Sequence, residues 1–171
     1  MADKYLSNQG GFPTEVEATV VSSGAGNAGD IPALDSTGRL DSSVLPSGIG
    51  ADTAIIEASE ALAAGDYVNV WADAGAFKVR KADAAGGTAK MAHGFVLSAV
   101  ASAANATVYF EGSNTQVTGM TPGNVWLSAT TPGAGVATPP TGTGQIVQPL
   151  GTAVSATVVN VEIGRQPIVL A

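Results

Sequence analysis

Apolar and polar residues alternate in short runs after about residue 51, and this pattern predicts β-strands. The clearest run is 76–81, in which Phe77 and Val79 alternate with Lys78 and Arg80. One face of that strand is therefore expected to be buried and the other solvated. The predicted strands span residues 53–58, 67–71, 76–81, 94–100, 106–111, 124–128, 146–150 and 153–163.

Turn residues separate these runs. Thr-Pro-Gly at 121–123 and again at 131–133 places proline and glycine as a type II turn requires. The low-complexity stretch 130–144 predicts a long exposed hairpin or loop. Residues 58–64, ASEALAA, favour helix but span only about two turns, so we expect a turn or a single helical loop there.

Residues 1–50 have a different pattern, with a glycine or proline every few positions, which excludes a helix of ordinary length. One strand-like run, EVEATVVS, spans 15–22, and isolated apolar residues follow it. Such a segment has no core of its own and must bury these residues against something else. The expected anchors of this arm are Val16, Val20, Ile31, Leu34, Leu40, Val44, Leu45 and Ile49.

These patterns together predict an all-β protein in two parts. Residues 51–171 are expected to form a small antiparallel β-barrel or sandwich, of jelly-roll or tulip-like type. Residues 1–50 are expected to form an extended N-terminal arm.

Composition narrows the possible functions. Only 12% of the 171 residues are charged, against about 25% in an average domain, so candidate catalytic groups are few. The net charge of −7, with seven basic residues, disfavours nucleic-acid binding. The absence of cysteine excludes a disulfide framework and a thiol nucleophile. No signal peptide or membrane span is predicted, so we expect a soluble chain made in a cytoplasm.

Charge is distributed unevenly along the chain. Residues 1–66 hold ten of the fourteen acids but only two bases, Lys4 and Arg39, a net −8 that leaves +1 for the remainder. Lys78, Arg80 and Lys81, with Lys90 further on, form a small basic group. This group is either a solvated face or a docking patch for an acidic partner, such as the arm of another copy.

No enzymatic motif is recognisable in the chain. The single histidine, His93, has no nucleophile motif near it, and the GxGxxG letters at 24–29 are followed by Pro32, which prevents the required helix. Asp35-Ser36-Thr37-Gly38 lacks the Asp-Thr-Gly order of an aspartic protease, and we expect an Asx turn there with Gly38 at positive φ. Asp35 and Asp41 lack the spacing of a calcium loop. We therefore expect no enzyme, no cofactor and no metal.

Residues 29–50, GDIPALDSTGRLDSSVLPSGIG, are similar to an "IxALDxxGRLDxSxxPxGIG" stretch of virion structural proteins of tailed bacteriophages. The segments EALAAGDYVNVW at 60–71, KVRKAD at 78–83, GFVL at 94–97, VYFEG at 108–112 and GTAVSAT at 151–157 resemble the body of the same proteins. The resemblance extends from Glu15 onward and does not cover the first fourteen residues.

The resemblance implies a head decoration, or cement, protein. Such proteins are small β-barrels on the outer capsid surface, commonly trimers, with an arm that reaches over neighbouring subunits. It implies the major capsid protein and further copies of this chain as partners, and a place in the virion after synthesis in the host cytoplasm. Two alternatives stay open: a tail-fibre or baseplate module that binds a host surface, and a carbohydrate-binding or enzymatic β domain. The second would need an aromatic platform, whereas Trp71 and Trp126 both lie within predicted strands, where packing in the core is commoner.

Overall fold

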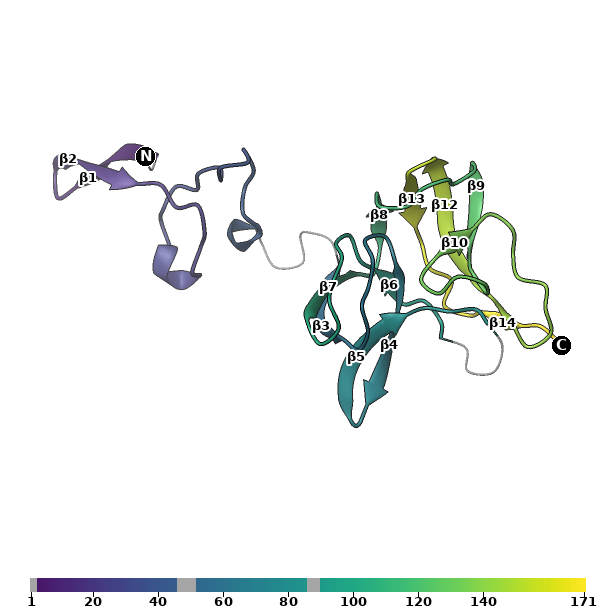
Figure 1. Cartoon of the computed structure of the whole chain (residues 1–171). Coiled ribbons are helices and arrows are strands. Elements are labelled where there is room, and N and C mark those ends of the chain that lie inside the picture. The colour runs from purple at the N-terminus through teal and green to yellow at the C-terminus, as the bar shows by residue number, and fades with distance from the viewer. Residues whose placement is uncertain (1–2, 46–51, 86–89) are drawn as a thin grey trace. The chain divides into compact units, whose positions relative to one another are not determined.

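The computed structural model is built almost entirely from β-strands, so the all-β prediction is confirmed (Figure 1). It describes residues 3–45, 52–85 and 90–171. Within those ranges the helical pieces are two 3₁₀ turns, η1 (Ala25–Asn27) and η2 (Ser42–Val44). The chain divides into two compact units, Met1–Gly50 and Ala51–Ala171. We call them the arm and the body, and describe each by itself.

The arm begins with a hairpin of β1 (Lys4–Gln9) and β2 (Phe12–Glu17), which pair antiparallel. Gly10 and Gly11 both have positive φ, which lets the chain reverse between the strands. The predicted strand at 15–22 is therefore only partly right, because β2 begins earlier and ends at Glu17. Strand β1 was not predicted, because KYLSNQ has little β-branched character.

After the hairpin the arm turns back on itself. Thr19 and Pro32 form a parallel bridge, and the Ser22 N–H donates to the Ser43 Oγ at 2.8 Å. Gly24 and Gly29, both at positive φ, lie in the segment that makes this return. Local turns and polar bonds give the arm its shape.

A closed barrel forms the first part of the body. Its strands follow the order β3-β5-β4-β6-β7 around the barrel. They are β3 (Thr53–Ala58), β4 (Tyr67–Asp73), β5 (Ala76–Lys81), β6 (Gly94–Phe95) and β7 (Asn105–Tyr109). The expected antiparallel arrangement is wrong at one place, because β3 pairs parallel to β5. The chain after β3 crosses to β4 before returning along β5, so β3 and β5 run in the same direction.

The barrel is filled by small and β-branched side chains. Its buried cluster consists of Ala58, Leu62, Val68, Val79, Val96, Ala106 and Val108. Val79 is fully buried as its strand pattern predicts, but Phe77 on the same face is 79% exposed. Phe77 pairs with Ala72 near the end of the β4–β5 hairpin, where it meets solvent. The alternation therefore predicts the strand correctly but not where the barrel ends.

A five-stranded antiparallel sheet forms the second part of the body, in the order β10-β9-β12-β13-β8. Its strands are β8 (Gly112–Asn114), β9 (Gly123–Leu127), β10 (Gly135–Val136), β12 (Pro149–Ser155) and β13 (Val158–Val161). Two short strands, β11 (Ile146–Val147) and β14 (Ile168–Val169), pair with each other. The larger buried cluster joins barrel residues such as Tyr67 and Phe95 to Leu127 and Leu150 of this sheet, so the body is one folded unit.

Four predicted segments differ in the structure. The strand predicted at 146–150 is divided between β11 and β12. The long strand at 153–163 is divided between β12 and β13 by a turn at Ala156 and Thr157. This turn contains neither glycine nor proline, so the sequence does not indicate it. The strand at 94–100 is reduced to the two residues of β6. The stretch 130–144 is not wholly exposed, because β10 pairs with β9 and Gly133 is buried.

Buried polar side chains connect the segments of the body. Gln148 is 1% exposed, and its side chain accepts from the Ala92 N–H at 2.8 Å. Its amide group donates to the carbonyls of Ala92 at 2.9 Å and Gly164 at 3.0 Å. Because every polar atom of this side chain is used, Gln148 holds three separate stretches of chain in one arrangement.

Candidate partner-binding surfaces

The arm exposes its apolar side chains. None of the described residues 3–45 is buried, whereas both parts of the body have buried clusters. Of the predicted anchors, Val20, Ile31, Leu34, Leu40 and Leu45 are exposed, and Val16 and Val44 are half-buried. Ile49 lies outside the described residues. The described part of the arm therefore has apolar surface available for a partner and no buried core of its own.

Three large exposed apolar side chains of the arm were not predicted as anchors: Val21, which is 64% exposed, and two residues of the hairpin. Leu6 is 74% exposed and Phe12 is 73% exposed, both in the hairpin. Leu6 and Phe12 lie in the first fourteen residues, where neither a strand nor a resemblance to phage proteins is predicted. The alternation in KYLSNQ and the aromatic residue after Gly10-Gly11 were the signals that could have identified them.

The hairpin has one charged face and one uncharged face. Tyr5 pairs with Val16 and Gln9 pairs with Phe12, which places these four side chains on one face with Ser7 and Thr14. The opposite face carries Lys4, Glu15 and Glu17, and Lys4 forms an ion pair with Glu15 at 3.3 Å. An isolated two-stranded hairpin is at best marginally stable in water, so packing against a partner would stabilise this one.

Aspartate side chains fix the turns of the arm. The Asp35 Oδ1 accepts from the backbone N–H groups of Thr37 at 2.8 Å and Arg39 at 3.0 Å, and from the Thr37 hydroxyl. The predicted Asx turn is thus confirmed, with Gly38 at positive φ. Hydrogen bonds from Thr37 and Arg39 lower the pKa of Asp35, and bonds from Ser43 lower the pKa of Asp41. Both carboxylates therefore act on their own turns.

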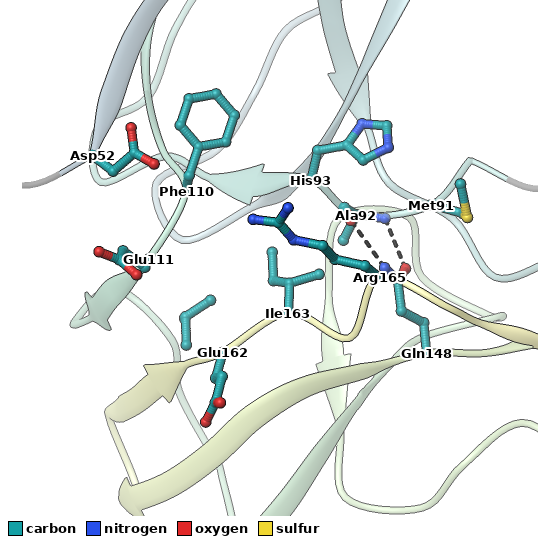
Figure 2. Close-up of a pocket in the computed structure, with 11 residues that line it drawn as sticks. Asp52, Met91, Ala92, His93, Phe110, Glu111, Gln148, Glu162, Ile163 and Arg165 are labelled. Atoms are coloured by element: carbon teal, nitrogen blue, oxygen red, sulfur yellow. Dashed lines mark hydrogen bonds between the residues drawn. The ribbon is translucent and has the colours of Figure 1, made fainter.

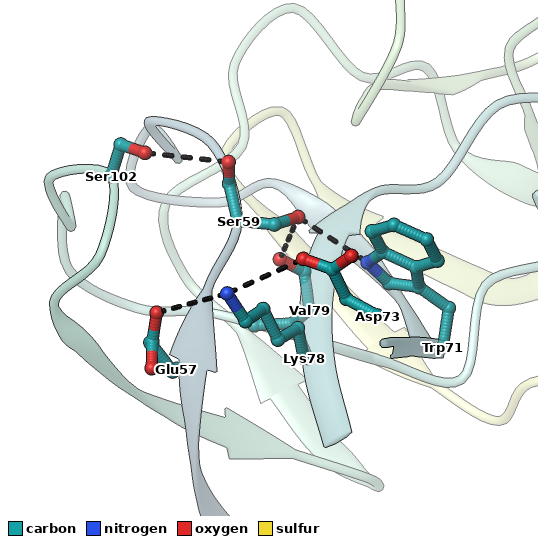
Figure 3. A network of polar contacts seen from close by, with 7 residues as sticks. All are labelled: Glu57, Ser59, Trp71, Asp73, Lys78, Val79 and Ser102. Atoms are coloured by element: carbon teal, nitrogen blue, oxygen red, sulfur yellow. Dashed lines mark hydrogen bonds and ion pairs between the residues drawn. The ribbon is translucent and has the colours of Figure 1, made fainter. Parts of the chain in front are cut away.

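Lys78 of the predicted docking patch is already paired within the body (Figure 3). Its Nζ lies 3.3 Å from the Glu57 Oε1 and 3.3 Å from the Asp73 Oδ2. Hydrogen bonds to these two carboxylates raise the pKa of Lys78, and the bond to Glu57 has the larger effect. The charge of this lysine is therefore balanced on the barrel surface itself.

The other two patch residues are also engaged. The Arg80 guanidinium lies 4.4 Å from the centre of the Trp71 ring, and its Nε donates to the Asn69 Oδ1 at 3.0 Å. The Lys81 Nζ lies 3.4 Å from the Asp66 Oδ2. Each basic residue of the patch thus has a partner in its own unit, and its docking role stays a prediction.

The tryptophans do not form an open aromatic platform of the kind that binds sugars. Arg80 lies over the Trp71 ring, and the Trp71 Nε1 donates to the Ser59 Oγ at 3.3 Å (Figure 3). Trp126 is half-buried within β9. A sugar would have to displace Arg80 to stack on that face of Trp71.

A cleft of about 780 Å³ lies in the body, between the end of the barrel and the segment that follows β13 (Figure 2). Phe110, Ile163 and Met91 supply apolar surface. Asp52, Glu111 and Glu162 supply carboxylates, and Arg165 supplies a guanidinium. Asp52 and Glu111 come from neighbouring segments, because the Phe110 N–H donates to the Asp52 carbonyl at 2.9 Å. Arg165 extends into the cleft in Figure 2.

His93 lines the same cleft and takes part in the barrel's bonding. Its Nδ1 accepts from the Val70 N–H at 3.0 Å, a bond that needs an unprotonated Nδ1. Burial lowers the pKa of His93, so the ring is neutral at pH 7. No nucleophile or carboxylate hydrogen bonds to the ring within the described residues, and those residues contain no group of His, Cys, Asp and Glu that could hold a metal ion.

Comparisons with known proteins give no relative for this chain: no family model, no curated protein and no solved structure matches it. In the ranges that the structure describes, none of the helices has the length and apolar character needed to cross a bilayer.

Proposed function

We propose that this chain is a bacteriophage head decoration protein, which binds the outer capsid surface and bridges capsid subunits through its arm. One observation carries the proposal: over its described residues 3–45 the arm exposes a series of apolar side chains and buries none, while the body has its own buried clusters. A body that is stable by itself and an arm that is incomplete by itself suit a protein that attaches to a preformed surface. The resemblance of residues 29–50 to phage virion proteins supports the same proposal.

The energetics require a large partner surface. Ordering the backbone costs roughly 1–2 kcal/mol per residue, and apolar burial returns about 25 cal/mol per Å². An arm of this length therefore needs an interface of roughly 2,000 Å² or more. A capsid shell offers such an area, because each decoration copy can contact several shell subunits and gain avidity from each further contact.

The arrangement of the body also suits a particle coat. Closure of the barrel removes its free strand edges, and the edge strands of the open sheet, β8 and β10, are only three and two residues long. Short edges resist edge-to-edge aggregation when many copies are crowded on one surface. Trimers of the body, which the resemblance implies, would multiply the number of arms per attachment.

Deleting residues 1–50 tests the proposal. We expect the remaining body to stay folded and soluble but to fail to bind purified heads that lack this chain, in a co-sedimentation assay. A finer test replaces three exposed arm residues, Val20→Asn, Ile31→Asn and Leu34→Asn, and should also abolish binding. Val154→Asn, at an exposed position in the body, is the control and should bind normally.

Full coating by the truncated body would overturn the role of the arm. The number of copies per virion separates decoration from the tail-fibre or baseplate alternative. Decoration requires hundreds of copies, and a count in the tens would favour the tail.

A further inference from the structure

The cleft in the body carries unbalanced negative charge beside apolar surface. Asp52, Glu111 and Glu162 line it, and no described cation lies within ion-pair distance of these carboxylates. Arg165 is the one basic residue among its lining residues, since His93 is neutral at pH 7. A side chain with an apolar stem and a cationic head matches this combination of apolar wall and acidic rim.

The arm carries a residue pair of this chemistry. Arg39 is exposed and has no carboxylate within ion-pair distance among the described residues, and the adjacent Leu40 is 46% exposed. The acids on either side of Arg39 in the sequence bond to their own turns, because Asp35 accepts from the Thr37 and Arg39 N–H groups and Asp41 accepts from the Ser43 N–H. The Arg39 charge acts on Asp35 only weakly, as the last of the influences that lower the pKa of that carboxyl. The turn at Asp35 therefore holds Arg39 and Leu40 in place without neutralising the guanidinium through an ion pair.

The other basic residues are less suitable. Lys4, Lys78 and Lys81 form ion pairs, and Arg80 lies against Trp71. Lys90 forms a backbone β-bridge with Asp83 in the body, and no large exposed apolar residue of the described chain adjoins it. Among the described basic residues, Arg39 combines an unpaired charge with an exposed apolar neighbour.

We propose that the cleft of one copy binds Arg39 and Leu40 from the arm of a second copy. Leu40 packs against Phe110 and Ile163, and the Arg39 guanidinium pairs with Asp52 and Glu111. This contact links neighbouring copies of the chain to each other, which goes beyond attachment to the shell. It uses two residues of the arm and leaves Val20, Ile31 and Leu34 available for the shell.

A charge exchange tests the pairing in the full-length chain. Sedimentation equilibrium measures the self-association constant of the unaltered chain and of Arg39→Glu, Glu111→Arg and the double variant. Each single reversal should weaken association roughly tenfold, and the double variant should restore most of it, because the two charges are then exchanged. Glu17→Arg changes the net charge by the same amount as Glu111→Arg but lies in the hairpin, so it should not weaken association.

Any one of three results would overturn the proposal. The unaltered chain could stay monomeric at every concentration tested, the single reversals could leave association unchanged, or the double variant could associate as weakly as the single variants. Circular dichroism of each variant establishes that its body is folded, so a loss of association cannot come from unfolding.

A spin label locates the contact and shows that it joins two copies. The chain has no cysteine, so Ser36→Cys gives a single attachment site in the Asp35 turn. Labelled chain of natural isotopic abundance is mixed with unlabelled ¹⁵N chain, and only contacts between copies broaden the ¹⁵N signals. We expect broadening at His93, Glu111 and Ile163 that disappears when the labelled copy also carries Arg39→Glu. Broadening elsewhere, or none at the cleft, would overturn the proposal.

Discussion

The arm and the body are built from similar residues but are held together differently. Both are rich in glycine and short strands, yet the arm relies on turns fixed by Asp35 and Asp41, whereas the body buries side chains such as Tyr67 and Leu127 completely. The hydrogen bonds of the arm's turns are exposed to water, where each contributes little net stability. Apolar burial and fully bonded polar groups inside the body contribute much more.

This difference teaches that strand content alone does not make an independent unit. The β1–β2 hairpin has regular pairing over six residues of each strand, but nothing covers its uncharged face within the described arm. The body's strands close into a barrel and pack on a second sheet. Substitutions at buried positions of the body should therefore lower its free energy of unfolding. Substitutions in the arm should leave the free energy of unfolding of the body unchanged.

The largest expected effect comes from Gln148→Leu. The change removes the bonds to Ala92 N–H, Ala92 carbonyl and Gly164 carbonyl and leaves these groups without that partner. At roughly 1–3 kcal/mol for each unpaired buried group, we expect a loss of about 4 kcal/mol in the free energy of unfolding, measured in urea. Gln116→Leu, at an exposed glutamine, is the control and should cost little. An equal cost at both positions would contradict the buried network.

A glycine pair compares the two regions directly. A Cβ on Gly94 would lie 2.5 Å from the Tyr109 carbonyl oxygen and 2.7 Å from the Val108 Cγ1. Gly94→Ala should therefore destabilise the body by about 3 kcal/mol through overpacking. In the arm, a Cβ on Gly26 meets only the Ser23 Oγ, at 3.4 Å. Gly26→Ala should leave the urea midpoint of the body unchanged, and a shift there would break the comparison.

The two regions should respond to acid in different pH ranges. Burial lowers the pKa of His93 below its ordinary value of 6.5. The unfolded chain therefore binds the proton more readily, and the body loses stability as the pH falls below about 6.5. Because the ring is only half-buried, the loss should be about 1 kcal/mol or less. His93→Gln should flatten the dependence of the urea midpoint between pH 7 and 5, and an unchanged slope would contradict this role.

Acid should act on the arm only at lower pH. Hydrogen bonds from Asn27 and Thr19 lower the pKa of Asp30, and similar bonds lower those of Asp35 and Asp41 below 3.8. The stabilisation of these turns is therefore present above about pH 3.8 and is lost as the pH falls through the lowered values. The amide signal of Thr37 should follow this change. Loss of its hydrogen-bonded shift already at pH 5 would contradict the assignment to Asp35.

The smallest effect is expected for Tyr67→Phe. The Tyr67 ring is fully buried against Phe95. Its hydroxyl lies near the Asn114 side chain but makes no hydrogen bond of acceptable geometry among the described residues. Burial raises the pKa of this hydroxyl to about 12. Removing an unpaired buried hydroxyl should be neutral or stabilise the body by up to about 1 kcal/mol. A clear loss of stability would show that the hydroxyl has a partner.

Sequence patterns predicted the strands better than their pairing. The strands Thr53–Ala58 and Ala76–Lys81 were predicted with the observed bounds, because alternation and flanking turn residues are local properties. Their parallel pairing was not predicted, because it depends on where the chain crosses after β3. The turn at Ala156 and Thr157 was missed because neither residue has a strong turn preference.

For the candidate surfaces, exposure could be predicted but charge pairing could not. Spaced apolar residues on a glycine-rich chain correctly indicated exposed side chains such as Leu34 and Leu40. The sequence does not indicate that Lys78 pairs with Glu57 and Asp73. Glu57 is on another strand, and its distance from Lys78 depends on how the strands pair. The cleft joins residues as far apart as Asp52 and Arg165, a proximity that only the folded chain defines.

Hydrogen exchange on the full-length chain tests the central claim most directly. Amide exchange is measured by mass spectrometry on the free protein and on the same protein bound to purified heads. We expect residues 3–45 to exchange fast in the free chain and to slow by at least about a hundredfold on the particle, while β4 and β12 stay protected throughout. Slow exchange of the arm in the free chain, or no slowing on the particle, would contradict the claim that the arm is ordered by a partner.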